Sequence, residues 1–210
     1  IMRKKPRLNC ELEKIDIQRI DSLIRENEYF EYFLIEDETI SNSSHMQFDR
    51  CIFNNVSFIN ITSEDVDIID CQFNNCDMSN ITIRNGSIHQ SEFINCRLTG
   101  VDMSDNTINN TLFKDCLMNY SNISNSKLKN DEFVNSDLKA ASLNDTSLLK
   151  VDLIESNFDD CELINANLRG IDFSTCQLKN IMINFDALKG IKVNDIQALS
   201  LVALLGIEIV

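Results

Sequence analysis

Apolar residues recur at every fifth position along most of the chain. When residues 46 to 185 are divided into consecutive blocks of five, the third residue is Phe, Leu, Ile or Met in 27 of the 28 blocks, and only Ser63 departs. A β-strand repeats its pattern every two residues and an α-helix every 3.6, so a period of five is typical of neither. The pattern therefore indicates a chain built from internal repeats.

The fifth residue of each block has the chemistry of a turn. It is Asn in 12 blocks, Asp in 6 and Gly in 2. Asn and Asp tolerate the left-handed backbone conformation, and their side chains bond to nearby backbone groups. Five residues would thus make one short side and one corner, with the first and third side chains pointing inward. Four such sides close a square coil of twenty residues.

Residues twenty apart should then stack on one another, and composition does sort at this period. One column is aromatic apart from Leu153, one is aliphatic, and one consists of cysteine and serine. These columns are Phe53, Phe73, Phe93, Phe113, Phe133 and Phe173; Ile68, Ile88, Ile108, Leu128, Leu148 and Leu168; and Cys76, Cys96, Cys116, Ser136, Ser156 and Cys176. The 28 blocks predict seven coils, and at the sheet spacing these form a rod about 34 Å long.

The repeat must be capped at both ends, because a terminal coil exposes unpaired edges. From residue 189 the period fails, and Asn194 or Asp195 can cap a helix that runs to about Leu205, with Gly206 after it and the final IEIV as a short strand. Since the helix is apolar nearly all round, one face can cover the last coil while another meets a second copy. We predict a homodimer through residues 189 to 210. The residues expected in its interface are Leu199, Leu201, Val202, Leu205, Ile207 and Ile209.

Residues 1 to 45 allow two interpretations, and the domain division is therefore 1–45, 46–188 and 189–210. In the first, pentapeptides continue in a shifted phase, with one group of apolar residues at first positions. This group is Cys10, Ile15, Ile20, Phe30, Ile35 and Ile40. In the second, an amphipathic cap helix covers Leu12 to Ile24. Both remain open at this level.

The chain is strongly acidic, with 33 Asp and Glu against 19 Lys and Arg and a net charge of −14. This charge argues against direct binding to nucleic acid and favours a basic partner, although it also serves solubility. Outward positions sort onto the four sides of the coil, and two sides gather the acidic residues. The first acidic face is Glu64, Asp65, Asp102, Asp105, Asp145 and Glu162, with Arg84 among them; the second acidic face is Glu92, Asp115, Glu132, Asp152, Glu155 and Asp172. A third side carries Lys127, Lys129, Lys150 and Arg169.

The second acidic face also carries outward apolar residues, which form the predicted apolar stripe. They are Ile52, Ile94, Leu112, Val134 and Ile154. This stripe supports an alternative function, in which a structural or scaffold protein recognises another protein through apolar contact. Salt separates the two hypotheses, because a charge-based contact weakens as salt rises and an apolar one does not.

Candidate catalytic and metal-binding residues are few. There are eight cysteines, and those of the repeat fall at inward positions where Ser, Ala and Val stand in other coils, so we interpret them as small buried fillers. His45 and His89 are the two histidines, and neither joins a nucleophile at a fixed spacing. We expect no enzyme, cofactor or metal. With no run of eighteen apolar residues, we also expect a cytoplasmic protein without membrane contact.

Asp131 is an unusual inward residue, in a column where Thr111 and Val151 precede and follow it. A buried carboxylate without partners would be costly. We hypothesise that it accepts hydrogen bonds from neighbouring backbone or hydroxyl groups; the alternative is a local distortion of the stretch KNDEF that turns it out to solvent.

The repeat resembles the pentapeptide-repeat family, whose consensus is a small residue, a polar residue, Leu or Phe, and two polar or small residues. The resemblance covers residues 46 to 188. The closing stretch LKGIKVNDIQALSLVALLGIEIV resembles the C-terminus of the Qnr and MfpA group. The matching positions are Leu188, Gly190, Lys192, Gln197, Ala198, Leu201, Leu205, Gly206 and Ile207.

This resemblance implies an all-β, right-handed quadrilateral β-helix that dimerises through its C-terminus. It further implies a DNA mimic that presents an acidic rod to a type II topoisomerase, with DNA gyrase protected from quinolones or inhibited. Several Qnr proteins have loops that interrupt the coils, whereas the phase here is unbroken from residue 46 to 188. The chain is therefore more similar to the loop-free MfpA type, for which inhibition is the firmer expectation.

Overall fold

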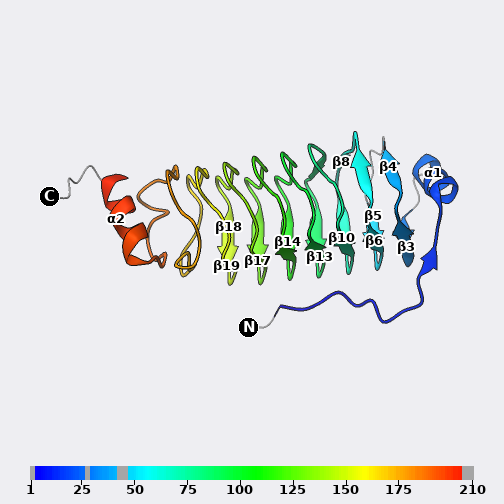
Figure 1. The fold of residues 1–210 in the computed structure, drawn as a ribbon, viewed down its shortest axis with the longest axis horizontal. Helices are drawn as coiled ribbons and strands as arrows, with labels where there is room; N and C mark the ends of the chain where they lie inside the picture. Colours follow the sequence, from blue (N-terminus) through cyan, green and yellow to red (C-terminus); the bar gives the residue numbers. More distant parts are fainter. Residues whose placement is uncertain (1–2, 27–28, 42–46, 205–210) are drawn as a thin grey trace.

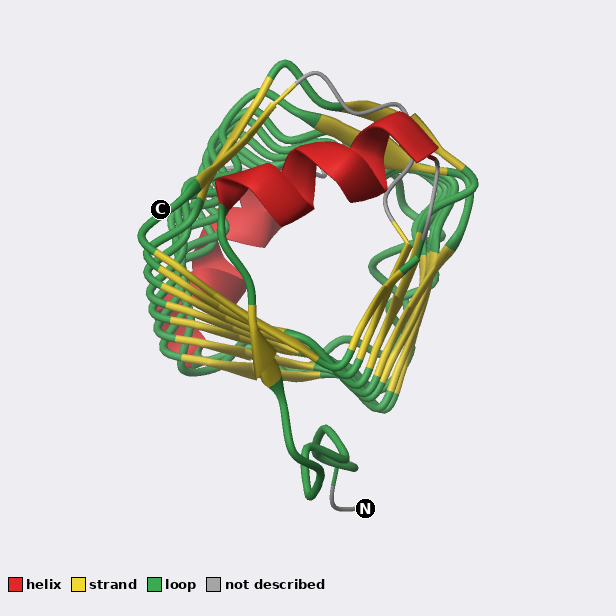
Figure 2. Ribbon diagram, turned by 90° about the vertical axis from the view of Figure 1, so that its right-hand side faces the viewer, coloured by secondary structure: helices red, strands yellow, loops and turns green. Residues whose placement is uncertain are grey.

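The computed structural model describes residues 3–26, 29–41 and 47–204. It is a parallel β-solenoid of about seven turns, as the sequence predicted, with helix α1 (Ile17–Glu26) at one end and helix α2 (Asp195–Leu204) at the other (Figure 1). Viewed along its axis, the solenoid has a four-sided outline (Figure 2).

Two sides of the solenoid are long parallel sheets, which we call the first and second sheets. The first sheet orders its strands as β1 (Glu13–Lys14), β3 (Phe33–Glu36), β6 (Ile52–Asn54), β10 (Gln72–Asn74), β13 (Glu92–Ile94), β15 (Leu112–Lys114), β17 (Glu132–Val134) and β19 (Asp152–Ile154). The second sheet orders β2 (Phe30–Glu31), β5 (Gln47–Asp49), β9 (Asp67–Ile69), β12 (Ser87–His89), β14 (Thr107–Asn109), β16 (Lys127–Lys129) and β18 (Ser147–Leu149).

The other two sides hold shorter pairs and single bridges. β4 (Thr39–Ser41) pairs with β7 (Ser57–Ile59), and β8 (Thr62–Glu64) pairs with β11 (Thr82–Arg84). Parallel bridges such as Asp77 to Arg97 continue these sides along the rod. Within the repeat the register is twenty residues, so that Phe73 pairs with Phe93, which confirms the predicted coil length.

The corners of the coils adopt the left-handed conformation that the Asn and Asp pattern predicted. Non-glycine residues at the fifth position hold φ between 47° and 61° in every block from 46 to 185 except those that end at Thr175 and Phe185. Asn95 (φ 54°) and Asp105 (φ 58°) are representative. The left-handed conformation costs Asn and Asp less free energy than it costs other non-glycine residues. The chain can therefore turn repeatedly with only five glycines.

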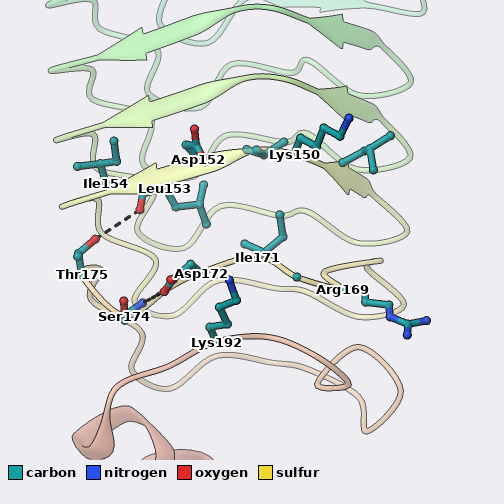
Figure 3. A pocket seen from close by; sticks show the side chains of 13 residues that line it. Lys150, Asp152, Leu153, Ile154, Arg169, Ile171, Asp172, Ser174, Thr175 and Lys192 are labelled. Carbon is teal, nitrogen blue, oxygen red and sulfur yellow. Dashed lines mark hydrogen bonds between the residues drawn. The ribbon is translucent and has the colours of Figure 1, made fainter. Parts of the chain in front are cut away.

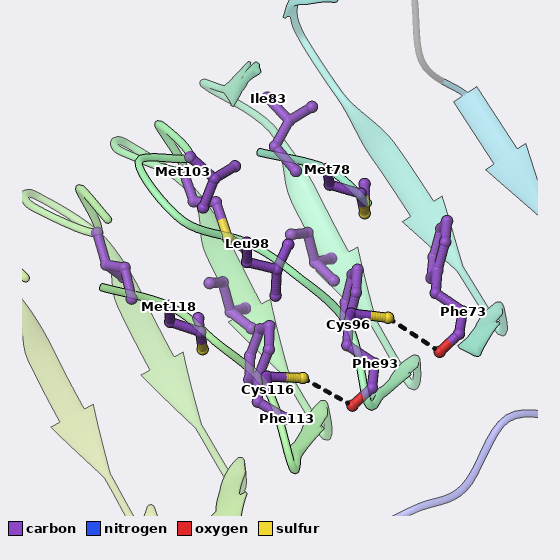
Figure 4. Close-up of a cluster of buried hydrophobic side chains, with 14 of the residues drawn as sticks. Phe73, Met78, Ile83, Phe93, Cys96, Leu98, Met103, Phe113, Cys116 and Met118 are labelled. Atoms are coloured by element: carbon purple, nitrogen blue, oxygen red, sulfur yellow. Dashed lines mark hydrogen bonds between the residues drawn. The ribbon is translucent and has the colours of Figure 1, made fainter. Parts of the chain in front are cut away.

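The core is a set of stacked columns. The rings of Phe53, Phe73 and Phe93 lie parallel with centroids 4.7 Å apart, and Phe113 and Phe133 continue the stack at 5.0 and 4.9 Å. The inward cysteines are buried, as predicted for fillers, and they also bond to the preceding coil. Cys96 and Cys116 donate to the carbonyl oxygens of Phe73 and Phe93 at 3.4 and 3.3 Å (Figure 4).

The N-terminal region combines the two interpretations left open by the sequence. An amphipathic helix does form, but α1 begins at Ile17 rather than at Leu12, because Asp16 accepts a hydrogen bond from the Arg19 amide and caps it. Its buried Ile20 and Leu23 join the core, and strand β4 contacts the helix.

Strands β2, β3 and β4 form a further coil, but the proposed phase was wrong. Phe30 pairs with Phe48 and Ile40 pairs with Phe58, which are third positions of their blocks. Phe30, Ile35 and Ile40 are therefore third-position residues, and the offset of 18 residues makes this coil two residues shorter than the later ones.

Asp131 is fully buried, and its predicted hydrogen bonds are present. Its two carboxylate oxygens accept from the backbone amides of Thr111 and Lys129, each at 2.7 Å. Burial raises the pKa of Asp131 to about 7, because the loss of water outweighs the two hydrogen bonds that favour the charged form.

Candidate protein-interaction surfaces

The first acidic face lies on the side of the solenoid that begins with β8 and β11. Its carboxylates are fixed to the outside of rigid coils, because each is one residue away from a buried third position or occupies a left-handed corner. Glu64, Asp65, Asp105 and Asp145 are exposed, while Asp102 and Glu162 are half-buried. The structure thus brings all six predicted residues onto one continuous side.

Hydrogen bonds hold several of these carboxylates in place without neutralising them. The Asn85 and Asn165 side chains donate to Asp65 and Asp145 at 3.0 and 3.1 Å, from the corner one coil further along. Asn144 donates to Glu162 at 2.7 Å. Amide donors leave the negative charge intact, so the face stays acidic while its side chains are positioned.

Arg84 neutralises only one end of the first acidic face. Its guanidinium lies 2.6 Å from Glu64 and 4.0 Å from Asp102, and these pairs raise the pKa of Arg84. The more distant members Asp105, Asp145 and Glu162 have no ion pair among the described residues.

The second acidic face lies on the first sheet and the coils that extend it. Asp152, Glu155 and Asp172 are exposed near the C-terminal end. Hydrogen bonds from the hydroxyl and amide of Ser174 lower the pKa of Asp172, so it stays charged. Asp115 is half-buried and accepts a hydrogen bond from Asn135 at 2.6 Å.

The remaining two carboxylates of this face are not free. Glu92 is buried and Glu132 is half-buried, because residues 3–12, which we call the N-terminal arm, run back along the outside of the rod (Figure 1). Arg3 of the arm lies 2.6 Å from Glu92 and 3.3 Å from Glu132. Sequence analysis placed both residues on an open face and missed the arm. The only available signal was the basic cluster RKKPR at residues 3–7.

The predicted apolar stripe is only partly accessible. Ile154 has 44% of its surface exposed, but Ile52, Ile94, Leu112 and Val134 are half-buried. The chain does not cover these four completely, and the stripe is a row of partly exposed side chains rather than an open apolar patch.

A cleft of about 540 Å³ lies among the last coils, and its lining includes Lys150, Arg169 and Lys192 as well as Asp152 and Asp172 (Figure 3). It contains both signs of charge. The predicted basic side is accessible to solvent. Its four exposed residues are Lys127, Lys129, Lys150 and Arg169.

Few groups are arranged for chemistry. Within residues 3–26, 29–41 and 47–204, no cluster of three or more His, Cys, Asp or Glu side chains could hold a metal ion. Burial raises the pKa of Cys161 to about 12, so this thiol is neutral and unreactive. In the described part of the chain, neither helix is long and apolar enough to cross a membrane.

Helix α2 is fixed to the last coil by two polar residues, Asn194 and Gln197, and the Asn194 side chain donates to the Ser174 carbonyl oxygen at 2.8 Å. Asn194 and Gln197 form a capping box, in which Asn194 accepts from the Gln197 amide at 3.0 Å and Gln197 accepts from the Asn194 amide at 2.8 Å. The Gln197 amide group also donates to the carbonyl oxygens of Phe173 and Cys176, both at 2.8 Å. These bonds satisfy the open backbone of the terminal coil.

The apolar surface of α2 is largely exposed. Leu199 has 54% of its surface exposed and Ile196 has 77%, while Leu201 and Val202 are half-buried. Leu205, Ile207 and Ile209, and the predicted short strand, lie outside the described residues.

Comparison with known proteins agrees with this architecture. A family profile described as a pentapeptide repeat region matches residues 66–143, and one described as pentapeptide repeats (8 copies) matches residues 132–180. Among curated proteins, no sequence matches the chain.

The solenoid is similar to solved structures of QnrB1, described as a plasmid-mediated fluoroquinolone resistance protein. One trypsin-treated variant of QnrB1 superposes with a TM-score of 0.71 at 22% identity, covering 94% of each chain. A second gives 0.58 at 20% identity, covering 100% of this chain and 97% of the other. These likenesses establish a shared fold. With two profiles matching more than half of the sequence and the coil geometry that their repeat requires, the chain belongs to the pentapeptide-repeat family.

Proposed function

We propose that this protein is a non-enzymatic DNA mimic that binds a type II topoisomerase, DNA gyrase first of all, and thereby inhibits it or protects it from quinolones. The proposal is supported by the shared fold with QnrB1 and by the acidic surface of the rod. It places the protein in the cytoplasm, where the enzyme acts.

The observation that carries the proposal is the first acidic face. Six carboxylates lie along one rigid side, and no ion pair within the described residues touches those beyond Asp102. A protein surface that binds DNA is complementary to negative charges spaced at regular intervals along a stiff rod. Coils about 4.8 Å apart provide that regularity.

The charge density is a partial match to DNA. Two chains of −14 give −28. Over a dimeric rod of about 80 Å this is about one net charge per 3 Å, compared with about one per 1.7 Å in duplex DNA. The protein would therefore occupy a DNA-binding surface with less electrostatic attraction than DNA and with a fixed shape.

The dimer in this proposal forms through α2. In an isolated rod the apolar side chains of Ile196 and Leu199 remain exposed to water. A two-fold contact between two α2 helices would bury both. It would also place the two solenoids end to end and double the length of the acidic face.

A scaffold that recognises another protein through the apolar stripe is the second candidate. The exposed Ile154 favours it, but its four companions are half-buried and offer little area. Contact through the stripe would be insensitive to salt, unlike contact through the acidic faces.

A gyrase supercoiling assay tests the proposal. The protein is titrated with and without a fluoroquinolone, and rescue of drug-poisoned gyrase indicates protection while loss of supercoiling alone indicates inhibition. Unchanged supercoiling at micromolar protein in both arms contradicts the gyrase proposal.

Variants identify the face that acts. Replacing Asp102, Asp105 and Asp145 by Asn removes three charges from the first acidic face, and we expect at least a tenfold loss of effect. The matched control replaces Asp115, Asp152 and Asp172 by Asn. It removes the same charge from the second acidic face, and an equal loss would show that only total charge matters.

A further inference from the structure

The N-terminal arm lies on a specific corner of the solenoid, between the second and first sheets. This corner is formed by fifth-position residues in successive coils, among them Asp70, Gln90 and Asn110. All three are buried, although most corner side chains in the solenoid are exposed or half-buried. The arm therefore occupies a surface whose composition differs from that of the other corners.

Both arginines of the arm make close ion pairs with the solenoid. The Arg7 guanidinium donates twice to one oxygen of Asp70, at 2.9 and 2.7 Å, and the Arg7 backbone amide donates to the other at 3.0 Å. Arg3 bridges Glu92 and Glu132, and the side chains of Arg3 and Glu92 are only 5% and 11% exposed. Charge-assisted bonds of this kind are the strong ones, particularly where water is excluded.

Corner side chains also bind the backbone of the arm between its arginines. The Asn110 side chain accepts from the Lys4 amide at 3.1 Å, and the Gln90 side chain donates to the Lys5 carbonyl at 3.3 Å. Gln90 also donates to Asp70 at 3.1 Å. Backbone contacts of this type fit any extended segment, while the three ion pairs of Arg3 and Arg7 select arginine at two positions four residues apart.

Nothing in the arm joins the β-ladder. Residues 3–12 contain no strand residue, and the first sheet begins with β1 at Glu13. Lys4 and Lys5 are exposed, and 63% of the Arg7 side-chain surface is exposed. The arm can therefore leave without breaking a coil, and its ion pairs weaken when salt or a competing cation is added.

We propose that residues 3–9 are an exchangeable arm that masks part of the second acidic face, and that an extended, arginine-bearing segment of a protein partner takes its place. Release of the arm uncovers Asp70, Glu92 and Glu132 together. The arm then acts as an autoinhibitory contact, because a partner must supply two arginines at matching positions to compensate the carboxylates it uncovers. This exchange is independent of the proposed topoisomerase partner.

The test uses the full chain and a fluorescein-labelled peptide of sequence RKKPRLN, with no topoisomerase present. In the chain carrying Arg3→Gln and Arg7→Gln, the arm no longer competes, and we expect the peptide to bind at least about tenfold more tightly than to the unaltered chain, as measured by fluorescence anisotropy. A peptide with Gln at both arginine positions is expected to bind neither chain.

Two further substitutions in the Arg3→Gln, Arg7→Gln chain test the site itself. Glu92→Gln should abolish the gain, whereas Asp152→Asn, on the same face but away from the arm, should leave it unchanged. Equal peptide binding to the altered and unaltered chains, or equal binding of the arginine-free peptide, overturns the proposal. Circular dichroism verifies the fold of each chain.

Trypsin cleavage of the unaltered chain is a second readout that needs no variant. Cleavage after Arg7 should accelerate several-fold when NaCl rises from about 50 to 500 mM. A cleavage rate that salt does not change shows that the arm does not exchange.

Discussion

At the residue scale, the corner positions explain how the chain turns so often with so little glycine. The third-position apolar residues and the fifth-position Asn and Asp were both readable from the sequence, because each reports a local requirement of the coil. Gly86 is an exception of another kind. A Cβ there would lie 2.0 Å from the Val66 carbonyl oxygen in the neighbouring coil. The five residues of one block do not reveal this close approach, because it depends on how two coils pack.

Ala140 is a corner where the local rule is broken, since it holds φ 56° without an Asn or Asp side chain. We expect Ala140→Gly to raise the free energy of unfolding by about 0.5 to 1 kcal/mol, because glycine removes the left-handed penalty. Chemical denaturation measures the effect. Ala141→Gly is the control, because Ala141 is buried at an ordinary φ, and it should lower stability. A loss in both variants would contradict the account of the corners.

Asp131 should make stability depend on pH in an unusual direction. Burial raises its pKa in the folded state to about 7, above the ordinary value of 3.8, so the folded chain binds more protons between these values. Its contribution to stability is therefore complete below about pH 4, falls as pH rises to about 7, and is constant above that.

Asp131→Asn removes this titration. Between about pH 5 and pH 8, we expect the unaltered chain to lose about 3 kcal/mol of unfolding free energy relative to the variant. The variant also loses one acceptor for the Thr111 or Lys129 amide, which is a constant offset. Urea unfolding at the two pH values makes the comparison, and parallel pH profiles would contradict the raised pKa.

At the element scale, strands were predictable and the ends were only partly so. The position of α1 depends on the Asp16 cap, which the sequence contained but which apolar periodicity alone did not show. The arm was not predictable by these means, because Arg3 and Glu132 are 129 residues apart and Arg7 and Asp70 are 63 apart. Such pairs leave no local pattern, and only the completed solenoid brings them together.

Gln197 makes two of the hydrogen bonds that attach α2 to the solenoid, beside the bond from Asn194 to Ser174. Gln197→Ala removes the capping box, leaves the Cys176 carbonyl oxygen without its donor and removes one of the two donors to the Phe173 carbonyl oxygen, so we expect a loss of about 2 to 3 kcal/mol. Hydrogen exchange of the α2 amides should accelerate. Gln177→Ala, at an exposed position with no side-chain bond among the described residues, is the matched control. Equal protection of α2 in both variants would show that other contacts hold the helix.

At the scale of the whole molecule, the solenoid is a rigid rod with unequal sides. One side is acidic and open, one is acidic and partly covered by its own arm, and one carries lysines. These differences follow from outward positions, which the coil does not constrain and which are therefore free to serve binding. The twenty-residue period of the sequence predicted which charged residues share a side. Which of these residues are accessible to solvent could be determined only from the structure.

The dimer is a prediction at this scale. Leu199→Asp places a charge on the exposed face of α2, and we expect it to convert a dimer to a monomer in analytical ultracentrifugation. Leu149→Asp is the control, because Leu149 is similarly exposed, at 52% against 54%, but lies on β18 in an earlier coil rather than on α2. A monomeric unaltered chain would contradict the predicted dimer.

The central claim, that the acidic rod binds where DNA binds, is tested most directly by the equilibrium affinity for DNA gyrase at two salt concentrations. We predict saturable binding at about 50 mM NaCl that weakens by at least about tenfold at about 200 mM and that linear duplex DNA displaces. Binding that neither salt nor DNA reduces would contradict mimicry and favour the apolar stripe. No binding at micromolar protein would contradict the gyrase assignment itself.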